Sequence, residues 1–103
     1  MPPQERPGPK IQRERILAAA LHLSQIGNYA TITREQITIY AQCSPGLLNH
    51  YYSTMAQLRR DVMRAAVRLR IGAIVAQGLV AKDPIALKAP EDLKKQAAAS
   101  ITS

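Results

Sequence analysis

The sequence predicts an all-α protein, and three observations lead to this prediction. Apolar residues recur one helical turn apart in two segments, around residues 16–24 and 58–80. Thr, Ser and Pro stand where helices would begin, and Gly-Asn and Asp-Pro stand where they would end. The 4 aromatic residues are all tyrosines, which leaves little material for a large β-sandwich core. At 103 residues the chain has the length of a single domain.

The chain should begin with an arm and a first helix. Residues 1–10 hold four of the seven prolines, which fix φ and lack a backbone donor, so we expect a disordered basic arm. The first helix should run from residue 11 to residue 26 with one apolar face. Gly27 and Asn28 both tolerate positive φ and would end it.

Two short helices should follow, separated by a tight turn. Thr33 and Gln36 have the spacing of a capping box, in which each side chain satisfies a backbone N–H at the helix start. Ser44 and Pro45 repeat the start signal, with Ser as the cap and Pro at the first helical position. This is a helix-turn-helix arrangement, and we assign it to a domain over residues 11–57.

A long helix and a short helix should make up residues 58–103. The long helix is capped by Thr54 and should run to about Ala81, and the short one should begin at Pro90 and end near Ser100. The segment from residue 71 to residue 81 is apolar on almost all sides, so it is either buried or meets a partner. We expect a homodimer that uses this region. The expected dimerisation residues are Leu69, Ala73, Ile74, Ala76, Leu79 and Val80.

The charge favours a nucleic acid as the partner. The chain has 14 Lys and Arg against 7 Asp and Glu, a net charge of +7. The first eighty residues hold ten of the basic and four of the acidic side chains. A basic surface of this kind attracts nucleic acid, although an ordinary protein of high pI is the alternative that charge alone leaves open.

The composition argues against other classes of function. One cysteine and two histidines permit no internal disulfide and no ordinary structural zinc site, so we expect no metal. No phosphate-binding glycine loop and no paired acid and base are present, so we expect no cofactor and no enzyme activity. No apolar run has membrane-spanning length, and the first residues lack the apolar stretch of a signal peptide. We therefore expect a cytoplasmic protein that does not bind a membrane.

Four stretches between residues 13 and 58 follow one family pattern. Residues 13–23 read RERILAAALHL, residues 33–44 TREQITIYAQCS, residues 44–52 SPGLLNHYY and residues 54–58 TMAQL. The corresponding family patterns, in the same order, are R-x-x-I-L-x-A-A-x-x-L, T-x-x-x-I-A-x-x-A-G-V-S, S-x-G-x-L-Y-x-H-F and S-K-E-E-L. Aligning the chain with them requires no gap between residues 33 and 58. This segment, nearly half of the chain, resembles the DNA-binding domain of the TetR family of bacterial transcriptional repressors.

The resemblance implies a TetR-like three-helix DNA-binding domain and a set of contact residues. The helix that begins at Pro45 would enter the major groove, with its first turn near the base edges. The residues that would face bases are Pro45, Gly46, Leu47 and His50. Those that would contact phosphates are Thr33, Arg34, Ser44, Asn49, Tyr51 and Thr54.

The sequence also departs from the family pattern. Gln42 replaces the turn glycine, at a cost of about 1 kcal/mol if the position keeps positive φ. Asn49 and Met55 replace a Tyr and a Lys that contact phosphates in the family, so those contacts would be weaker. Cys43, at a Val position, should be a small buried apolar residue. The residues after the motif are too few for the family's ligand-binding domain, so we expect no small-molecule ligand.

Taken together, these observations predict a transcriptional regulator that binds double-stranded DNA. We expect a dimeric repressor on an inverted-repeat operator, without a small-molecule sensor, in a bacterial cell and of a kind suited to a phage or plasmid. The alternative is a protein-interaction module that pairs with a full-length repressor or another partner and antagonises it. A membrane-surface helix over residues 59–81 is disfavoured, because its arginines are spread over several faces.

Overall fold

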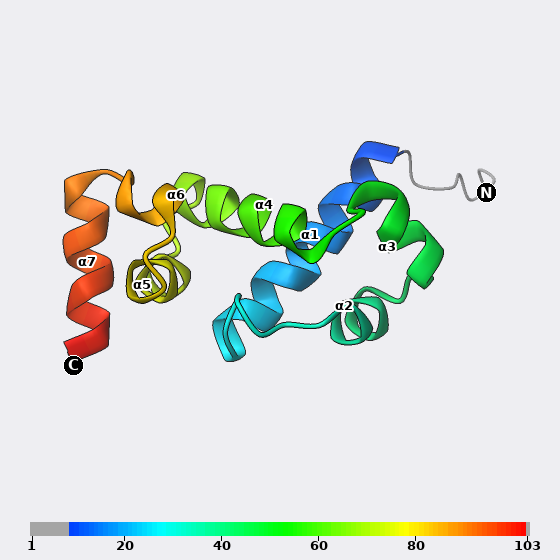
Figure 1. Cartoon of the computed structure of the whole chain (residues 1–103), viewed down its shortest axis with the longest axis horizontal. Coiled ribbons are helices and arrows are strands. Elements are labelled where there is room, and N and C mark those ends of the chain that lie inside the picture. The colour runs from blue at the N-terminus through cyan, green and yellow to red at the C-terminus, as the bar shows by residue number, and fades with distance from the viewer. Residues whose placement is uncertain (1–8, 103) are drawn as a thin grey trace, which may run out of the picture.

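The structure is a computed structural model that describes residues 9–102, and every regular element in this part is a helix (Figure 1). The all-α prediction is therefore confirmed. Of the helices in this range, none combines the length and the apolar character that a membrane crossing requires. The helices are α1 (Pro9–Ile26), α2 (Arg34–Ala41), α3 (Pro45–Tyr51), α4 (Met55–Arg68), α5 (Gly72–Val80), α6 (Pro84–Leu87) and α7 (Glu91–Thr102).

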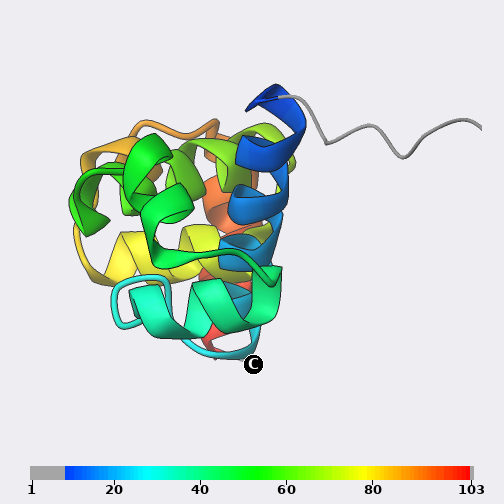
Figure 2. The ribbon, with the colours of Figure 1, turned by 90° about the vertical axis from the view of Figure 1, so that its right-hand side faces the viewer.

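The helices form two groups joined by α4. The first group, here called the head, consists of α1, α2 and α3 (residues 9–51), and it occupies one end of the molecule (Figure 1). The second group, the C-terminal unit, consists of α5, α6 and α7 (residues 72–102) and occupies the other end. The molecule is elongated, with extents of 49 × 28 × 22 Å. Seen from the head end, α2 and α3 lie in front (Figure 2).

The helix starts that the sequence predicts are present. The Thr33 hydroxyl accepts a hydrogen bond from the Gln36 N–H, and the Gln36 side chain accepts one from the Thr33 N–H, which completes the capping box. The Ser44 hydroxyl accepts from the Leu47 N–H at 3.1 Å, with Pro45 at the first helical position. Local hydrogen-bonding chemistry therefore explains why α2 and α3 begin where they do.

The prediction of one long helix from the Thr54 cap to about Ala81 is wrong. α4 ends at Arg68, Arg70 has φ 58°, and α5 begins at Gly72. The Ile71 N–H donates to the Ala66 carbonyl and the Arg70 N–H to the Val67 carbonyl, which is a Schellman motif with Arg70 in the left-handed position. The chain turns here because a straight continuation would leave the apolar segment 72–80 exposed, whereas the turn packs it against α4 and α7.

Two further boundaries differ from the prediction. α1 begins at Pro9, so the last two residues of the expected arm are helical, and residues 1–8 of that arm lie outside the described residues. No helix is predicted between residues 84 and 90, but α6 forms there because the Asp83 carboxylate accepts from the Ile85 N–H and Pro84 stands at the first position. The final helix, predicted to begin at Pro90 and end near Ser100, is present as α7, which runs from Glu91 to Thr102.

Three helix ends carry a long side chain in the left-handed conformation. Gln42, Arg70 and Lys82 have φ values of 55°, 58° and 58°. At each, the following residue donates its N–H to the carbonyl five residues earlier, as in Cys43 to Thr38 at 3.1 Å. The strained turn that the resemblance suggested for Gln42 is therefore present, and two more such positions follow it.

Gln42→Gly is expected to stabilise the protein by about 0.5–1 kcal/mol, because glycine adopts positive φ without a Cβ clash. Gln25→Gly is the matched control. Gln25 is exposed within α1 at ordinary helical φ, so the same change there should cost about 1 kcal/mol. Urea unfolding followed by circular dichroism measures both. Loss of stability in Gln42→Gly would contradict the strain at this turn.

A polar contact fixes the C-terminal unit to the head. The Gln77 side chain, on α5, donates to the carbonyls of Ser24 (2.8 Å) and Gly27 (3.2 Å) and accepts from the Tyr29 N–H (2.8 Å). The Tyr29 hydroxyl donates to Asp83 at 2.9 Å. Burial, with this hydrogen bond, raises the pKa of Tyr29 to about 12. The end of α1 therefore depends on residues some fifty positions later in the chain.

Candidate nucleic-acid interface

Helix α3 is divided into an inner and an outer face. Leu48 is fully buried, in the same core as Ile37 of α2, and this anchors the helix. Four residues are exposed, and they lie on one side because a helix has 3.6 residues per turn. We call them the outer face of α3: Pro45, Gly46, Asn49 and His50. Three of the four residues predicted to face bases therefore stand on the exposed side of a well-anchored helix.

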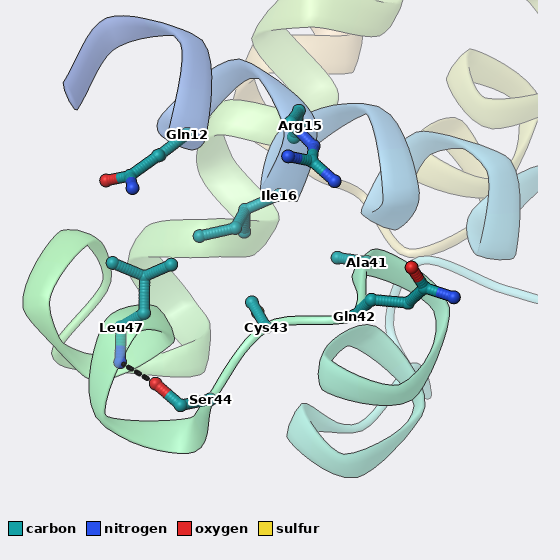
Figure 3. Close-up of a pocket in the computed structure, with 8 residues that line it drawn as sticks. All are labelled: Gln12, Arg15, Ile16, Ala41, Gln42, Cys43, Ser44 and Leu47. Atoms are coloured by element: carbon teal, nitrogen blue, oxygen red, sulfur yellow. Dashed lines mark hydrogen bonds between the residues drawn. The ribbon is translucent and has the colours of Figure 1, made fainter. Parts of the chain in front are cut away.

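Leu47 is the exception, and the structure corrects its predicted place. Its side chain is half-buried and points towards α1, where it lines a cleft of about 260 Å³ together with Ile16 and Cys43 (Figure 3). Leu47 therefore does not share the outer face of α3 with His50. The reason is that α1 packs across the head and offers Leu47 an apolar neighbour that the local pattern does not reveal.

Cys43 lines the same cleft and is half-buried (Figure 3). Burial raises the pKa of its thiol, which is opposed by the weaker effect of Arg15 nearby. The thiol is therefore neutral at pH 7, as expected of a small apolar residue, but Cys43 is half-buried rather than buried as predicted.

Three of the predicted phosphate contacts are helix caps. The hydroxyls of Thr33, Ser44 and Thr54 each accept a hydrogen bond from the backbone N–H three residues later, at 3.2, 3.1 and 3.2 Å. All three residues are exposed. The capping box satisfies two N–H groups at the start of α2, and the hydroxyl cap satisfies one at α3 and one at α4. Further N–H groups of each first turn remain as donors.

Arg34 and Asn49, which the resemblance treats as separate contacts, are bound to each other. The Arg34 guanidinium donates to the Asn49 Oδ1, to the Ser53 carbonyl at 2.9 Å and to the Tyr52 carbonyl at 3.4 Å. These bonds join the first residue of α2 to the end of α3. Arg34 therefore has a structural role in positioning α3, and the Asn49 amide nitrogen remains as the donor on the outer face.

The Tyr51 side chain is held by α1, whereas Asn49 is held by Arg34 of α2. The Tyr51 hydroxyl donates to the Gln12 Oε1, on α1, at 2.9 Å, and the Tyr51 ring meets the His50 ring edge to face with centroids 4.9 Å apart. The Tyr51 hydroxyl is thus directed at α1 and is half-buried, unlike the exposed imidazole beside it. Contact of Tyr51 with a phosphate would have to compete with Gln12.

A polar group that the sequence does not reveal joins α1, α3 and α4. The Asp61 carboxylate accepts from Arg13 at 3.0 Å, from the Tyr52 hydroxyl at 2.9 Å and from Arg64 at 3.3 Å. Although burial opposes it, these hydrogen bonds hold the pKa of Asp61 below its usual value. No local pattern signals this group, because Arg13 and Asp61 are separated by 48 positions.

In the structure, some of the expected dimerisation residues are buried and the others are exposed or half-buried. Ile74 and Ala76 are buried in the core of the chain itself, packed by α4 and α7, so they offer no surface to a partner and that part of the prediction is wrong. Leu69, Ala73 and Val80 are exposed, and Leu79 is half-buried. The turn at Arg70 causes this division, since it folds α5 back onto its own chain.

The described residues contain no group of three or more His, Cys, Asp or Glu side chains arranged to hold a metal ion. No protein-family model matches the chain, and searches of curated proteins and of solved structures found no significant similarity to it.

Proposed function

We propose that this protein binds double-stranded DNA sequence-specifically through α3 and acts as a dimeric transcriptional repressor. The observation that carries the proposal is the outer face of α3, whose four exposed residues stand on a helix anchored by buried Leu48 and held by Arg34 and Gln12. A recognition helix needs this combination, because base contacts require a presented face and fixed geometry.

The chemistry of the outer face suits the major groove. The groove is about 12 Å wide and admits one helix. The His50 imidazole offers a donor or an acceptor to a base edge, and the Asn49 amide nitrogen is a donor. Pro45 and Gly46 allow close approach at the first turn of α3. The helix starts at Thr33, Ser44 and Thr54 would supply backbone N–H groups to phosphates.

The oligomer is part of the proposal. A two-fold dimer would read an inverted repeat with half-sites about 34–36 Å apart, or a multiple of one helical turn. The exposed apolar residues Leu69 and Val80, which are 55% and 70% exposed, lie at or beyond the ends of α5 and are the candidates for the dimer contact.

Selection of duplexes from a random pool tests the proposal. We expect enrichment of an inverted repeat. His50→Ala should lower the preference for that repeat over random duplex about fivefold or more, since one good base contact is worth about 1–3 kcal/mol. The matched control is His22→Ala, because His22 is also exposed but lies on α1, stacked on Tyr40 with centroids 4.7 Å apart. Fluorescence anisotropy on both duplexes gives the ratio. Absence of any enriched sequence, or an unchanged ratio in His50→Ala, would refute the proposal.

A protein-interaction module is the second candidate, and one observation favours it. Ile39 and Tyr40, at the end of α2, are 70% and 51% exposed, which is unusual for large apolar side chains. If this surface binds a partner protein, the chain should show no preference for any duplex. In that case, Ile39→Ser should weaken the complex measured with a full-length repressor. If DNA binding is the function instead, Ile39→Ser should leave the affinity for DNA unchanged.

A further inference from the structure

The arginines of α4 and of the turn after it fall into two groups in the structure. Arg59 turns inward, donates to the Ile32 carbonyl at 3.4 Å and has a buried Nε. Arg70 is paired with Asp92. The remaining three are exposed and lie at intervals of four residues on one face of α4: Arg60, Arg64 and Arg68. Only this second group presents its charge along a continuous surface.

Arg13 of α1 extends the same surface. It lies across from α4, and its side chain remains 57% exposed although it contacts Asp61, while that of Arg64 remains 63% exposed. Two adjacent hollows of about 380 and 310 Å³ run between α1 and α4, and both are lined by Arg13, Asp61 and Arg64. Arg60 lines the first hollow and Arg68 the second. We call Arg13, Arg60, Arg64 and Arg68 the arginine patch.

The arginine patch carries more positive than negative charge. Its four guanidiniums share the hollows with two carboxylates, Glu14 and Asp61. Asp61 bonds Arg13 and Arg64 at once, so it holds them side by side without neutralising both. Within residues 9–102, neither Arg60 nor Arg68 forms an ion pair. Charge that is exposed, ordered and only partly compensated is what an anionic ligand recognises.

The position of the arginine patch indicates which anion it meets. The first hollow is also lined by Tyr51 and Tyr52, so the patch begins where α3 ends. From Arg60 to Arg68 the helix rises about 12 Å, so the patch is long enough to reach more than one phosphate of a DNA strand. A membrane surface would require an apolar face beside the charges, whereas the apolar residues of α4 larger than alanine are buried in the core or packed against it.

We propose that the arginine patch is a second DNA contact, which binds the phosphates of one strand beside the groove that α3 enters. This inference rests on the proposed function and deepens it. The patch would supply affinity without reading bases, because guanidinium–phosphate bonds carry no sequence information. It would also replace the phosphate contacts that the TetR pattern places at residues 49 and 55, where this chain has Asn49 and Met55.

The test is a salt titration of duplex binding by the double variant Arg60→Gln/Arg64→Gln. Each lost phosphate contact lowers the slope of log affinity against log salt by about 0.9, so we expect a decrease of about two for each bound protomer, or about four for the proposed dimer. Affinity should fall by the same factor on selected and random duplexes, which preserves the preference. The matched control is Lys88→Gln/Lys95→Gln, which removes the same charge from exposed positions in the C-terminal unit and should leave the slope unchanged. Ethylation interference should show phosphates that matter for the wild type and not for Arg60→Gln/Arg64→Gln.

Each outcome decides between the two proposals. If Arg60→Gln/Arg64→Gln keeps the wild-type slope while selection still enriches a sequence, the arginine patch is refuted and the proposed function stands. If the slope decreases but no sequence is preferred, the patch is supported and sequence-specific repression is refuted. If the wild type binds no duplex at low salt, both are refuted. Loss of binding to phosphatidylserine vesicles in the double variant, with unchanged duplex binding, would assign the patch to a membrane instead. Urea unfolding checks that the variant folds, which we expect because exposed ion pairs contribute little to stability.

Discussion

Leu48→Ala is expected to destabilise the protein by about 2–5 kcal/mol, the range for a buried leucine cut to alanine. Leu48 is fully buried, and it belongs to the same core as Ile37 and Leu58. The change leaves a cavity between α3 and the rest of the head in addition to the lost transfer energy. Because small domains are stable by only about 5–15 kcal/mol, this is a large share of the total. The midpoint of urea unfolding, followed by circular dichroism, measures the change.

The neighbouring leucine provides the control. Leu47 is half-buried at the cleft against α1, so Leu47→Ala should cost clearly less than Leu48→Ala. Leu87, which is 47% exposed on α6, should tolerate alanine within about 0.5 kcal/mol. Equal losses for Leu47→Ala and Leu48→Ala would contradict the division of α3 into an inner and an outer face.

Gly78→Ala is expected to destabilise the protein by about 1–3 kcal/mol through overpacking. A Cβ at Gly78 would lie 2.4 Å from the Met63 Cε and 2.6 Å from the Ala86 Cβ, both of which are closer than atoms can approach. Met63 is flexible and can move, but Ala86 is fully buried on α6 and has no side chain to rotate. The clash therefore outweighs the gain of about 1 kcal/mol that alanine brings to a helix interior.

Two further variants make the test of Gly78 specific. Gly72→Ala, at the start of the same helix, meets only the Ala97 Cα at 3.9 Å, an ordinary contact, so it should be neutral or slightly stabilising. Ala86→Gly added to Gly78→Ala should recover part of the loss, with a coupling energy of at least about 0.5 kcal/mol. Additive losses in this double-mutant cycle, read from unfolding free energies, would show that α5 and α6 do not meet at Gly78.

The helix starts of this protein could be predicted because their causes are local. Thr33 and Gln36, and Ser44 with Pro45, satisfy or remove backbone donors within one turn, and the structure contains those hydrogen bonds. The helix ends were less predictable. Gly27 follows α1 as expected, and α5 ends at Val80, close to the predicted Ala81, but α4 ends at Arg68 before the left-handed Arg70, where the sequence has no glycine signal. A left-handed residue with a long side chain persists only where the surrounding packing compensates for its strain.

The candidate site was likewise only partly predictable from the sequence. Pattern and spacing placed Pro45, Gly46 and His50 on the outside of α3, and these residues are exposed there. They also placed Leu47 outside, because nothing within α3 shows that its side chain faces α1 across a cleft. Likewise, the arginines of α4 look equivalent in the sequence, and only their distant neighbours distinguish the inward Arg59 from the exposed Arg60.

Periodicity and capping chemistry were sufficient to predict an all-α chain, the two short helices and the turn between them, since these signals act over three or four residues. The break at Arg70, the burial of Ile74 in its own chain and the contact of Gln77 with the end of α1 were decided only by the tertiary structure. The physical reason is that burial depends on which segment covers an apolar face. In this protein the covering segment lies twenty to fifty positions away, as for α7 over α5 and for Gln77 beside Ser24.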